Sequence, residues 1–96
     1  MIKGKTKAGF GFEVNENIGK DFRIVMATKK INTESTLEKV EGIYDFVEAI
    51  LGKDGVEKMV SFTTKKKGYA DTEYILEQAN EILAYATEKS SEVKKS

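Results

Sequence analysis

Residues 35–52, STLEKVEGIYDFVEAILG, carry the clearest structural pattern of this 96-residue sequence. Ser35 and Glu38 have the spacing of a capping box, in which each side chain satisfies a backbone N–H at the start of a helix. Apolar residues then recur every three or four positions opposite an acidic face, which predicts an amphipathic helix that ends at Gly52. Phe46 lies outside the apolar face and is expected to be half exposed. The expected inward residues are Leu37, Val40, Ile43, Tyr44, Val47, Ile50 and Leu51.

Two further helices are predicted downstream of this stretch. The sequence DGVE at residues 54–57 repeats the cap pattern and opens a short helix, which a polar, basic loop over residues 63–68 ends. Asp71 or Thr72 then caps a long final helix. Residues 88–96 contain one apolar residue and are expected to form a flexible tail. The expected inward residues are Val56, Met59 and Val60 in the short helix, and Ile75, Ala79, Ile82, Leu83 and Ala86 in the long one.

Upstream, a short helix is predicted over about residues 18–30. Asn17 is the expected N-cap, and Asp21 adds a negative charge near the first turn, where the helix dipole favours it. One face of this helix carries Phe22, Val25, Met26 and Lys29. The helix is therefore expected to be amphipathic, with these residues on a common side.

Residues 1–16 are expected to form an extended arm or a short β-hairpin. Phe10 and Phe12 alternate with glycines at the period of a strand. Two roles stay open for these rings: they cap the helical core, or they dock on a neighbouring subunit or client. The predicted fold is mainly α, with about four helices in one small domain over residues 1–87, counting the arm, and the tail over residues 88–96.

Composition excludes most enzyme chemistry. Cysteine and histidine are both absent, which removes disulfides, Cys/His zinc sites and nucleophiles that depend on an imidazole base. No catalytic residue, cofactor site or metal site is predicted. No stretch has the length of a signal peptide core or a membrane span, so the protein is expected in the cytoplasm, away from membranes. The formal net charge of zero argues against a dedicated nucleic-acid-binding protein.

Charge is nevertheless unevenly distributed along the chain. The first 30 residues hold seven Lys and Arg against three Asp and Glu, whereas residues 31–64 hold three against seven. Opposite patches on one surface attract copies of the same molecule and favour head-to-tail self-association. The alternative is ordinary solvated surface charge.

Two short motifs, a glycine-rich stretch and a run of lysines, are of kinds that bind nucleotides or nucleic acids. GFGFEV at residues 9–14 lacks the third glycine of a dinucleotide-binding loop, and Asp54 follows Gly52-Lys53 where a phosphate loop needs Ser or Thr. Nucleotide binding is therefore not expected. The run Lys65–Lys67 with Tyr69 nearby, together with the basic N-terminal third, supports an alternative function as a small nucleic-acid-binding or regulatory module.

The order of motifs resembles the tail assembly chaperones of long-tailed bacteriophages that infect Gram-positive hosts. The resemblance covers roughly residues 5–87 and departs from the family pattern at Lys53-Asp54, where two acids or an acid and a glutamine are more usual. The matching pieces are Thr6 to Val14, Asp21-Phe22, Ile50-Leu51-Gly52, Glu57-Lys58-Met59, Gly68-Tyr69 and Glu81-Ile82.

This resemblance implies a non-enzymatic phage or prophage protein that acts in the host bacterial cytoplasm. It would bind and solubilise the tape-measure protein, help to recruit tail tube protein, and be absent from the finished virion. A longer product made by ribosomal frameshifting would contact the tube protein, and the copies would form a homo-oligomer arranged as an open spiral. The expected contact residues, for other copies or for the client, are Phe10, Phe12, Phe22, Phe46 and Tyr69.

Overall fold

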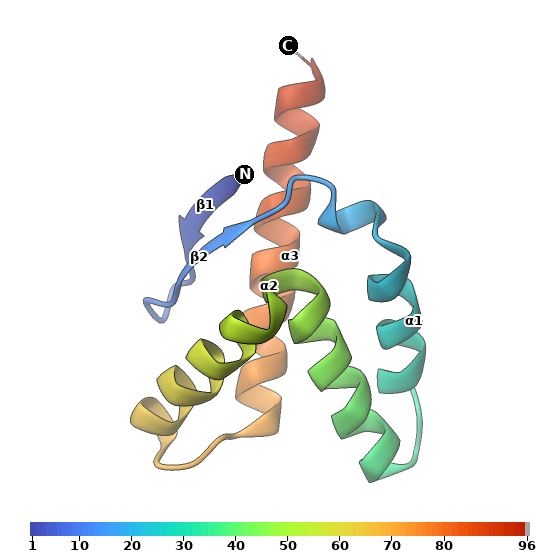
Figure 1. Cartoon of the computed structure of the whole chain (residues 1–96), viewed down its shortest axis with the longest axis vertical. Coiled ribbons are helices and arrows are strands. Elements are labelled where there is room, and N and C mark those ends of the chain that lie inside the picture. The colour runs from blue at the N-terminus through green and yellow to red at the C-terminus, as the bar shows by residue number, and fades with distance from the viewer. Residues whose placement is uncertain (96) are drawn as a thin grey trace.

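The computed structural model describes the backbone of residues 1–95 and the side chains of residues 1–90. Figure 1 shows a small hairpin beside a set of helices, so the mainly α prediction is confirmed. The described residues contain three α-helices, whereas the sequence predicts about four. The element order is β1 (Ile2–Lys5), β2 (Gly11–Val14), the 3-10 helix η1 (Ile18–Lys20), α1 (Phe22–Ile31), α2 (Thr36–Lys67) and α3 (Thr72–Lys95).

The difference in helix number arises at Gly52. This residue has φ 78° and ψ 175°, outside the helical region, and the helix resumes immediately after it. The two helices expected on either side of Gly52 are therefore the first arm (residues 36–51) and the second arm (residues 53–67) of one bent helix. Figure 1 shows α2 as an inverted V, with α3 behind it and α1 beside the first arm.

Replacing Gly52 with alanine is expected to lower the free energy of unfolding by about 1–3 kcal/mol, because the combination of positive φ and ψ near 180° is essentially restricted to glycine. Beyond Gly52 and its two chain neighbours, no heavy atom lies within 4 Å of the position that this Cβ would take, so the loss reports local backbone strain alone. Urea unfolding followed by circular dichroism measures it. Gly11→Ala is the control, because φ is not positive at Gly11, and a change within about 0.5 kcal/mol is expected there. Equal stabilities for the two variants would contradict the need for this bend.

The N-terminal arm is a hairpin, which settles the alternative left open by the sequence. β1 and β2 pair antiparallel, with Ile2 opposite Val14 and Gly4 opposite Phe12. The loop between them is closed by the N–H of Thr6, which donates to the carbonyl of Phe10 at 2.9 Å. The Thr6 hydroxyl also accepts a hydrogen bond from the N–H of Phe10 at 3.1 Å. The loop is thereby fixed from both directions.

The hairpin is anchored to the helices by its two phenylalanines. The Phe10 ring meets Phe62 of α2 edge-on at a centroid distance of 5.3 Å, and the Phe12 ring meets Tyr85 of α3 at 5.5 Å. Such edge-to-face pairs add about 0.5–1.5 kcal/mol to the burial of the rings. Of the two roles open to these residues, the structure places both in the core.

The predicted helix over residues 18–30 starts later than expected. Residues 18–20 form η1, and Asn17 makes no side-chain cap there. The N-cap of α1 is Asp21, whose carboxylate accepts a hydrogen bond from the N–H of Arg23 at 2.9 Å. Asp21 was expected to contribute only charge, and it instead supplies the capping oxygen.

Half of the predicted capping box at Ser35 forms. The Ser35 hydroxyl accepts a hydrogen bond from the N–H of Glu38 at 3.4 Å. The second bond of a capping box would join the N–H of Ser35 to the Glu38 carboxylate, and here the Thr33 hydroxyl lies between these groups. It accepts a hydrogen bond from the N–H of Ser35 at 3.3 Å and donates one to the Glu38 carboxylate at 3.1 Å. Thr33 thus bridges the two groups that a capping box joins directly.

The predicted basic loop over residues 63–68 is wrong. The second arm stays helical to Lys67, and Gly68 ends it in left-handed backbone with φ 85°. The polar residues were predicted to form a loop, but both parts of the segment fit a helix. Thr63 is fully buried. Lys65 to Lys67 form the last turn, where the helix dipole favours positive charge. The expected tail at residues 88–96 lies largely outside the described side chains, and the α3 backbone is helical to Lys95.

The core lies where the hairpin, α1, both arms of α2 and α3 meet, and it corrects the expected inward face of residues 35–52. Phe46, expected to be half exposed, is 2% exposed. Leu37, Val40 and Tyr44, expected to be inward, are exposed. The buried residues of the first arm are Gly42, Ile43, Phe46, Val47 and Ile50, which themselves recur at helical spacing.

Candidate interaction surfaces

The five aromatic residues expected to make contacts divide into two groups. Phe10, Phe12 and Phe46 are buried against the protein's own core. They reach another molecule only if the hairpin or the first arm detaches. Phe22 and Tyr69 are exposed and available for contact. The Tyr69 hydroxyl donates to the Asp71 carboxylate at 3.2 Å, and this hydrogen bond, with the Asp71 charge, raises the pKa of Tyr69.

The first exposed surface, the α1 face, consists of Phe22, Val25 and Met26, which are 72%, 53% and 52% exposed. The sequence groups these residues on one side of the helix, and the structure turns that side outward. Ile24 and Ala27 point inward instead. The short α1 can bury only its narrow inward side against α2, so most of its apolar surface stays in contact with water.

The α1 face depends on Asp21 for the start of its helix. The Arg23 guanidinium donates to the Asp21 carboxylate at 2.7 Å. The side-chain hydrogen bond from Arg23, followed by the backbone hydrogen bond of the same residue, lowers the pKa of Asp21 below the ordinary 3.8. The carboxylate is therefore ionised in the folded state at neutral pH, as a helix N-terminus favours.

Removing this cap in Asp21→Ala is expected to cost about 0.5–2 kcal/mol of unfolding free energy. Because the folded pKa of Asp21 is lowered, its contribution is complete above the unfolded value of about 3.8 and is lost as the pH falls through the folded value. Unfolding curves at pH 7 and pH 3 measure the loss. Asp21→Asn keeps the capping oxygen and is the control, which should lose less than Asp21→Ala. An alanine variant as stable as the parent at pH 7 would contradict the cap.

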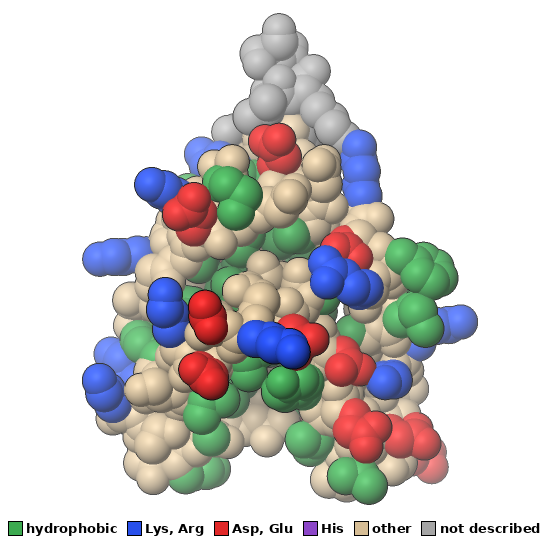
Figure 2. Space-filling model, viewed as in Figure 1, with side chains coloured by type: hydrophobic (Ala, Val, Ile, Leu, Met, Phe, Trp, Pro, Cys, Tyr) green, Lys and Arg blue, Asp and Glu red, His purple; other side chains and the backbone are tan. Residues whose placement is uncertain are grey.

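The second exposed surface, the α2 groove, lies between the two arms of the bent helix. A hollow of about 430 Å³ is lined by Tyr44 from the first arm and by Val56 and Val60 from the second, with Lys53, Glu57 and Ser61 also at its walls. Leu37 and Val40 extend the exposed apolar row of the first arm at the spacing of Tyr44. Figure 2 shows hydrophobic and acidic side chains on both arms.

Carboxylates surround the polar end of this groove. The nearby Glu48 carboxylate, as a hydrogen-bond acceptor for the Tyr44 hydroxyl, is the largest cause that raises the pKa of Tyr44. The charges of Glu48, Asp45 and Glu57 raise it further. The groove therefore combines apolar walls with negative potential at the Tyr44 hydroxyl, and its own lining carries one carboxylate, Glu57, and one cation, Lys53.

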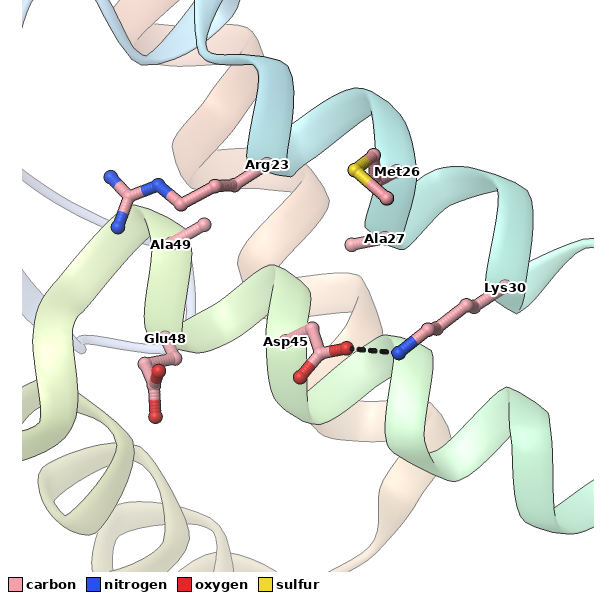
Figure 3. Close-up of a pocket in the computed structure, with 7 residues that line it drawn as sticks. All are labelled: Arg23, Met26, Ala27, Lys30, Asp45, Glu48 and Ala49. Carbon is pink, nitrogen blue, oxygen red and sulfur yellow. Dashed lines mark hydrogen bonds and ion pairs between the residues drawn. The ribbon is translucent and has the colours of Figure 1, made fainter.

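A second hollow, of about 250 Å³, lies between α1 and the first arm (Figure 3). Lys30 of α1 reaches Asp45 of α2 at 2.8 Å, and the bond raises the pKa of Lys30. A protonated lysine paired in this way is neither a base nor a nucleophile. Both side chains are about half exposed, so the pair adds little stability. This hollow is a contact between helices and offers no group poised for chemistry.

The basic residues behind the nucleic-acid alternative lie at the end of α2. Lys66 sits over the ring of Phe62 at 5.6 Å, and Lys67 sits over Tyr74 at 5.2 Å. These aromatic rings thus contact the protein's own lysines, whereas a single-strand binding site needs rings free to stack on bases. Tyr69 is the exposed aromatic of this turn.

Two other kinds of feature, a metal site and a membrane-spanning helix, are not found among the described residues. In the part of the chain that the structure describes, no three Asp, Glu, His or Cys side chains are grouped so that they could hold a metal ion. None of the described helices is both long enough and apolar enough to span a membrane.

Comparison with known proteins gives no relative: the chain matches no family model, no curated protein and no solved structure. The α1 face and the α2 groove are therefore the features of the molecule that bear on its function. The sequence pattern predicted that four residues now found exposed would lie in the core: Leu37, Val40, Tyr44 and Val60. A usable indication was present, because residues 35–52 carry apolar side chains over more of the helix than one buried face requires.

Proposed function

We propose that this chain is a non-enzymatic tail assembly chaperone of a long-tailed bacteriophage or prophage. The observation that carries the proposal is that two separate apolar surfaces, the α1 face and the α2 groove, are left uncovered on a protein of 96 residues. A chain that lacks cysteine and histidine has few routes to catalysis. Binding another protein's apolar surface requires none of these reactive groups.

Two surfaces suit a coat made of many copies. Each copy in a coat must contact the client and also a neighbouring copy. The α2 groove has the form that accepts an amphipathic helix between two apolar walls, and the client here is a helical segment of the tape-measure protein. The α1 face is a convex helix surface suited to a neighbouring copy. Contacts of this small area are weak and reversible, as a hand-over to tube subunits requires.

The remaining features of the proposal follow from the resemblance in motif order. The copies form a homo-oligomer, arranged as an open spiral because a head-to-tail contact does not close on itself. A longer frameshift product recruits the tail tube protein. The work takes place in the host bacterial cytoplasm, and the chaperone is absent from the finished virion.

Co-expression with the tape-measure protein encoded beside this chain tests the proposal. The soluble fraction of the tape-measure protein should rise several-fold, and the two should purify together. Val60→Asp, which puts a charge on an apolar wall of the groove, should abolish the gain. An insoluble tape-measure protein in the presence of the parent chain would refute the proposal.

The nucleic-acid alternative is separated by a second variant. Replacing Lys65, Lys66 and Lys67 with glutamine should leave the rescue of the tape-measure protein intact. The alternative instead requires salt-sensitive binding of DNA or RNA that these replacements weaken. Gel-shift titration at 50 mM and 200 mM salt distinguishes the two functions.

A further inference from the structure

The acidic residues of the first arm serve two sides of the same helix. Asp45 turns toward α1 and pairs with Lys30 at 2.8 Å. Glu48, one turn further along, lines the same hollow between α1 and the first arm (Figure 3). Its charge also acts on the hydroxyl of Tyr44, which lines the groove. The charges of these two carboxylates beside α1 therefore also act on Tyr44, at the edge of the α2 groove.

The α1 helix provides an example of what this acidic helix binds. Its sequence, FRIVMATKKI, is an apolar helix with Arg23, Lys29 and Lys30 as its charged residues and no acid. It packs on the first arm through Ile24 and Ala27, while Lys30 pairs with Asp45. The positive charge of Arg23 also lies within the field of Glu48. Apolar packing flanked by cation–carboxylate contacts is thus the way in which this molecule already holds a helix against α2.

The groove repeats these conditions with no helix in it. Tyr44, Val56 and Val60 supply the apolar walls, and Glu57 and Glu48 supply negative charge at the polar end. Glu41 lies four residues before Asp45, and its charge acts on Lys30 of α1. Lys53 and Glu57 are the charged residues at the wall of the hollow, whereas the charges that act on the Tyr44 hydroxyl come from three carboxylates, Glu48, Asp45 and Glu57.

We propose that the α2 groove selects a cationic amphipathic helix of a client protein, with apolar residues at i, i+3, i+4 and i+7 and Lys or Arg beside them. The inference depends on the proposed function and names the chemistry of the client segment. Apolar burial gives such a complex its affinity, and the carboxylates give it selectivity, since like charges brought together are repelled. An acidic amphipathic helix with the same apolar residues should be rejected.

Two designed 18-residue peptides test the selectivity. Both carry leucine at the apolar positions, and the remaining positions are lysine and alanine in one peptide and glutamate and alanine in the other. Binding to the full chain is measured by fluorescence anisotropy at 50 mM and 500 mM salt. We expect the lysine peptide to bind at least about 10-fold more tightly at low salt, and the ratio to fall at high salt because ions screen exposed charges.

Matched variants locate the site. Val60→Asp should reduce binding of the lysine peptide at least about 10-fold, whereas the same substitution on the α1 face, Val25→Asp, should leave it unchanged. Glu48→Gln with Glu57→Gln removes one charge from a half-buried position and one from an exposed position, and it should reduce the preference for the lysine peptide while apolar contacts remain. Circular dichroism confirms that each variant is folded, and the Gln variant still tests the inference if Val60→Asp is not.

Three results would overturn the inference. One is equal affinity for the two peptides, and another is binding lost in Val25→Asp but kept in Val60→Asp. The third is self-association that Val60→Asp abolishes in sedimentation velocity without peptide, which would assign the groove to a second copy. Rescue of the tape-measure protein together with equal peptide affinities would refute the selectivity and leave the chaperone function standing.

Discussion

Replacing Phe12 with alanine is expected to lower the free energy of unfolding by about 3–5 kcal/mol, the range for a buried phenylalanine. Phe12 is buried and its ring meets Tyr85 at 5.5 Å, so truncation leaves a cavity between the hairpin and α3. A domain of this size has a total stability of about 5–10 kcal/mol. The variant should therefore be largely or partly unfolded at 37 °C.

The matched control is the same substitution at an exposed site. Phe22 is 72% exposed, so Phe22→Ala should change the unfolding free energy by less than about 0.5 kcal/mol. Urea unfolding followed by far-ultraviolet circular dichroism gives both values. If Phe12 instead served contacts between copies, Phe12→Ala would lower the sedimentation coefficient and leave the unfolding curve in place.

The second large effect is expected at Gly42, where α1 crosses α2. A Cβ added there would lie 2.8 Å from the Cβ of Lys30 and 2.9 Å from the backbone nitrogen of Ile31. Backbone cannot move aside without shifting α1, and overpacking of this kind costs about 1–3 kcal/mol. Gly→Ala in an open helix position would instead gain up to about 1 kcal/mol. A net loss in Gly42→Ala therefore means that the clash outweighs the propensity.

A larger side chain at the same place should cost more. Gly42→Leu is expected to displace α1 and to destabilise the protein beyond Gly42→Ala. It should also weaken any contact made by the α1 face, because that face moves with its helix. Thermal unfolding of the two variants gives the order of stabilities. Stabilisation by either substitution would contradict the close approach of the two helices.

Local chemistry allowed much of the fold to be predicted. The cap at Ser35, the interruption at Gly52 and the start of the last helix near Asp71 all depend on contacts between near neighbours in sequence. The alternation around Phe12 likewise predicted an extended segment. The mainly α class and the small N-terminal β element followed from these short-range patterns.

The errors arose where tertiary packing decides. Phe46 and Tyr44 are two residues apart on one helix, and only the positions of α1 and α3 determine which of them is buried. Thr63 looks like a loop residue in sequence, yet its position in the second arm buries it against the core. The α2 groove could not be predicted at all, because it depends on the angle between two arms that meet at Gly52.

The same limit applies to the candidate contact residues. Phe22 and Tyr69 are exposed, whereas Phe10, Phe12 and Phe46 are buried. Aromatic residues occur both in protein cores and in interfaces. Sequence periodicity does not distinguish these two environments when a helix has apolar residues on several sides. The groove residues Tyr44 and Val60 emerged only from the arrangement of the arms.

The central claim is that many copies of this small helical protein cover the apolar surface of one long client. Size-exclusion chromatography with multi-angle light scattering, applied to the complex co-purified with the tape-measure protein, tests it most directly. The account predicts one soluble peak that contains many copies of this chain for each client chain, and loss of that peak with Val60→Asp. A parent chain that elutes as a free monomer, with the client aggregated or soluble alone, would contradict the account.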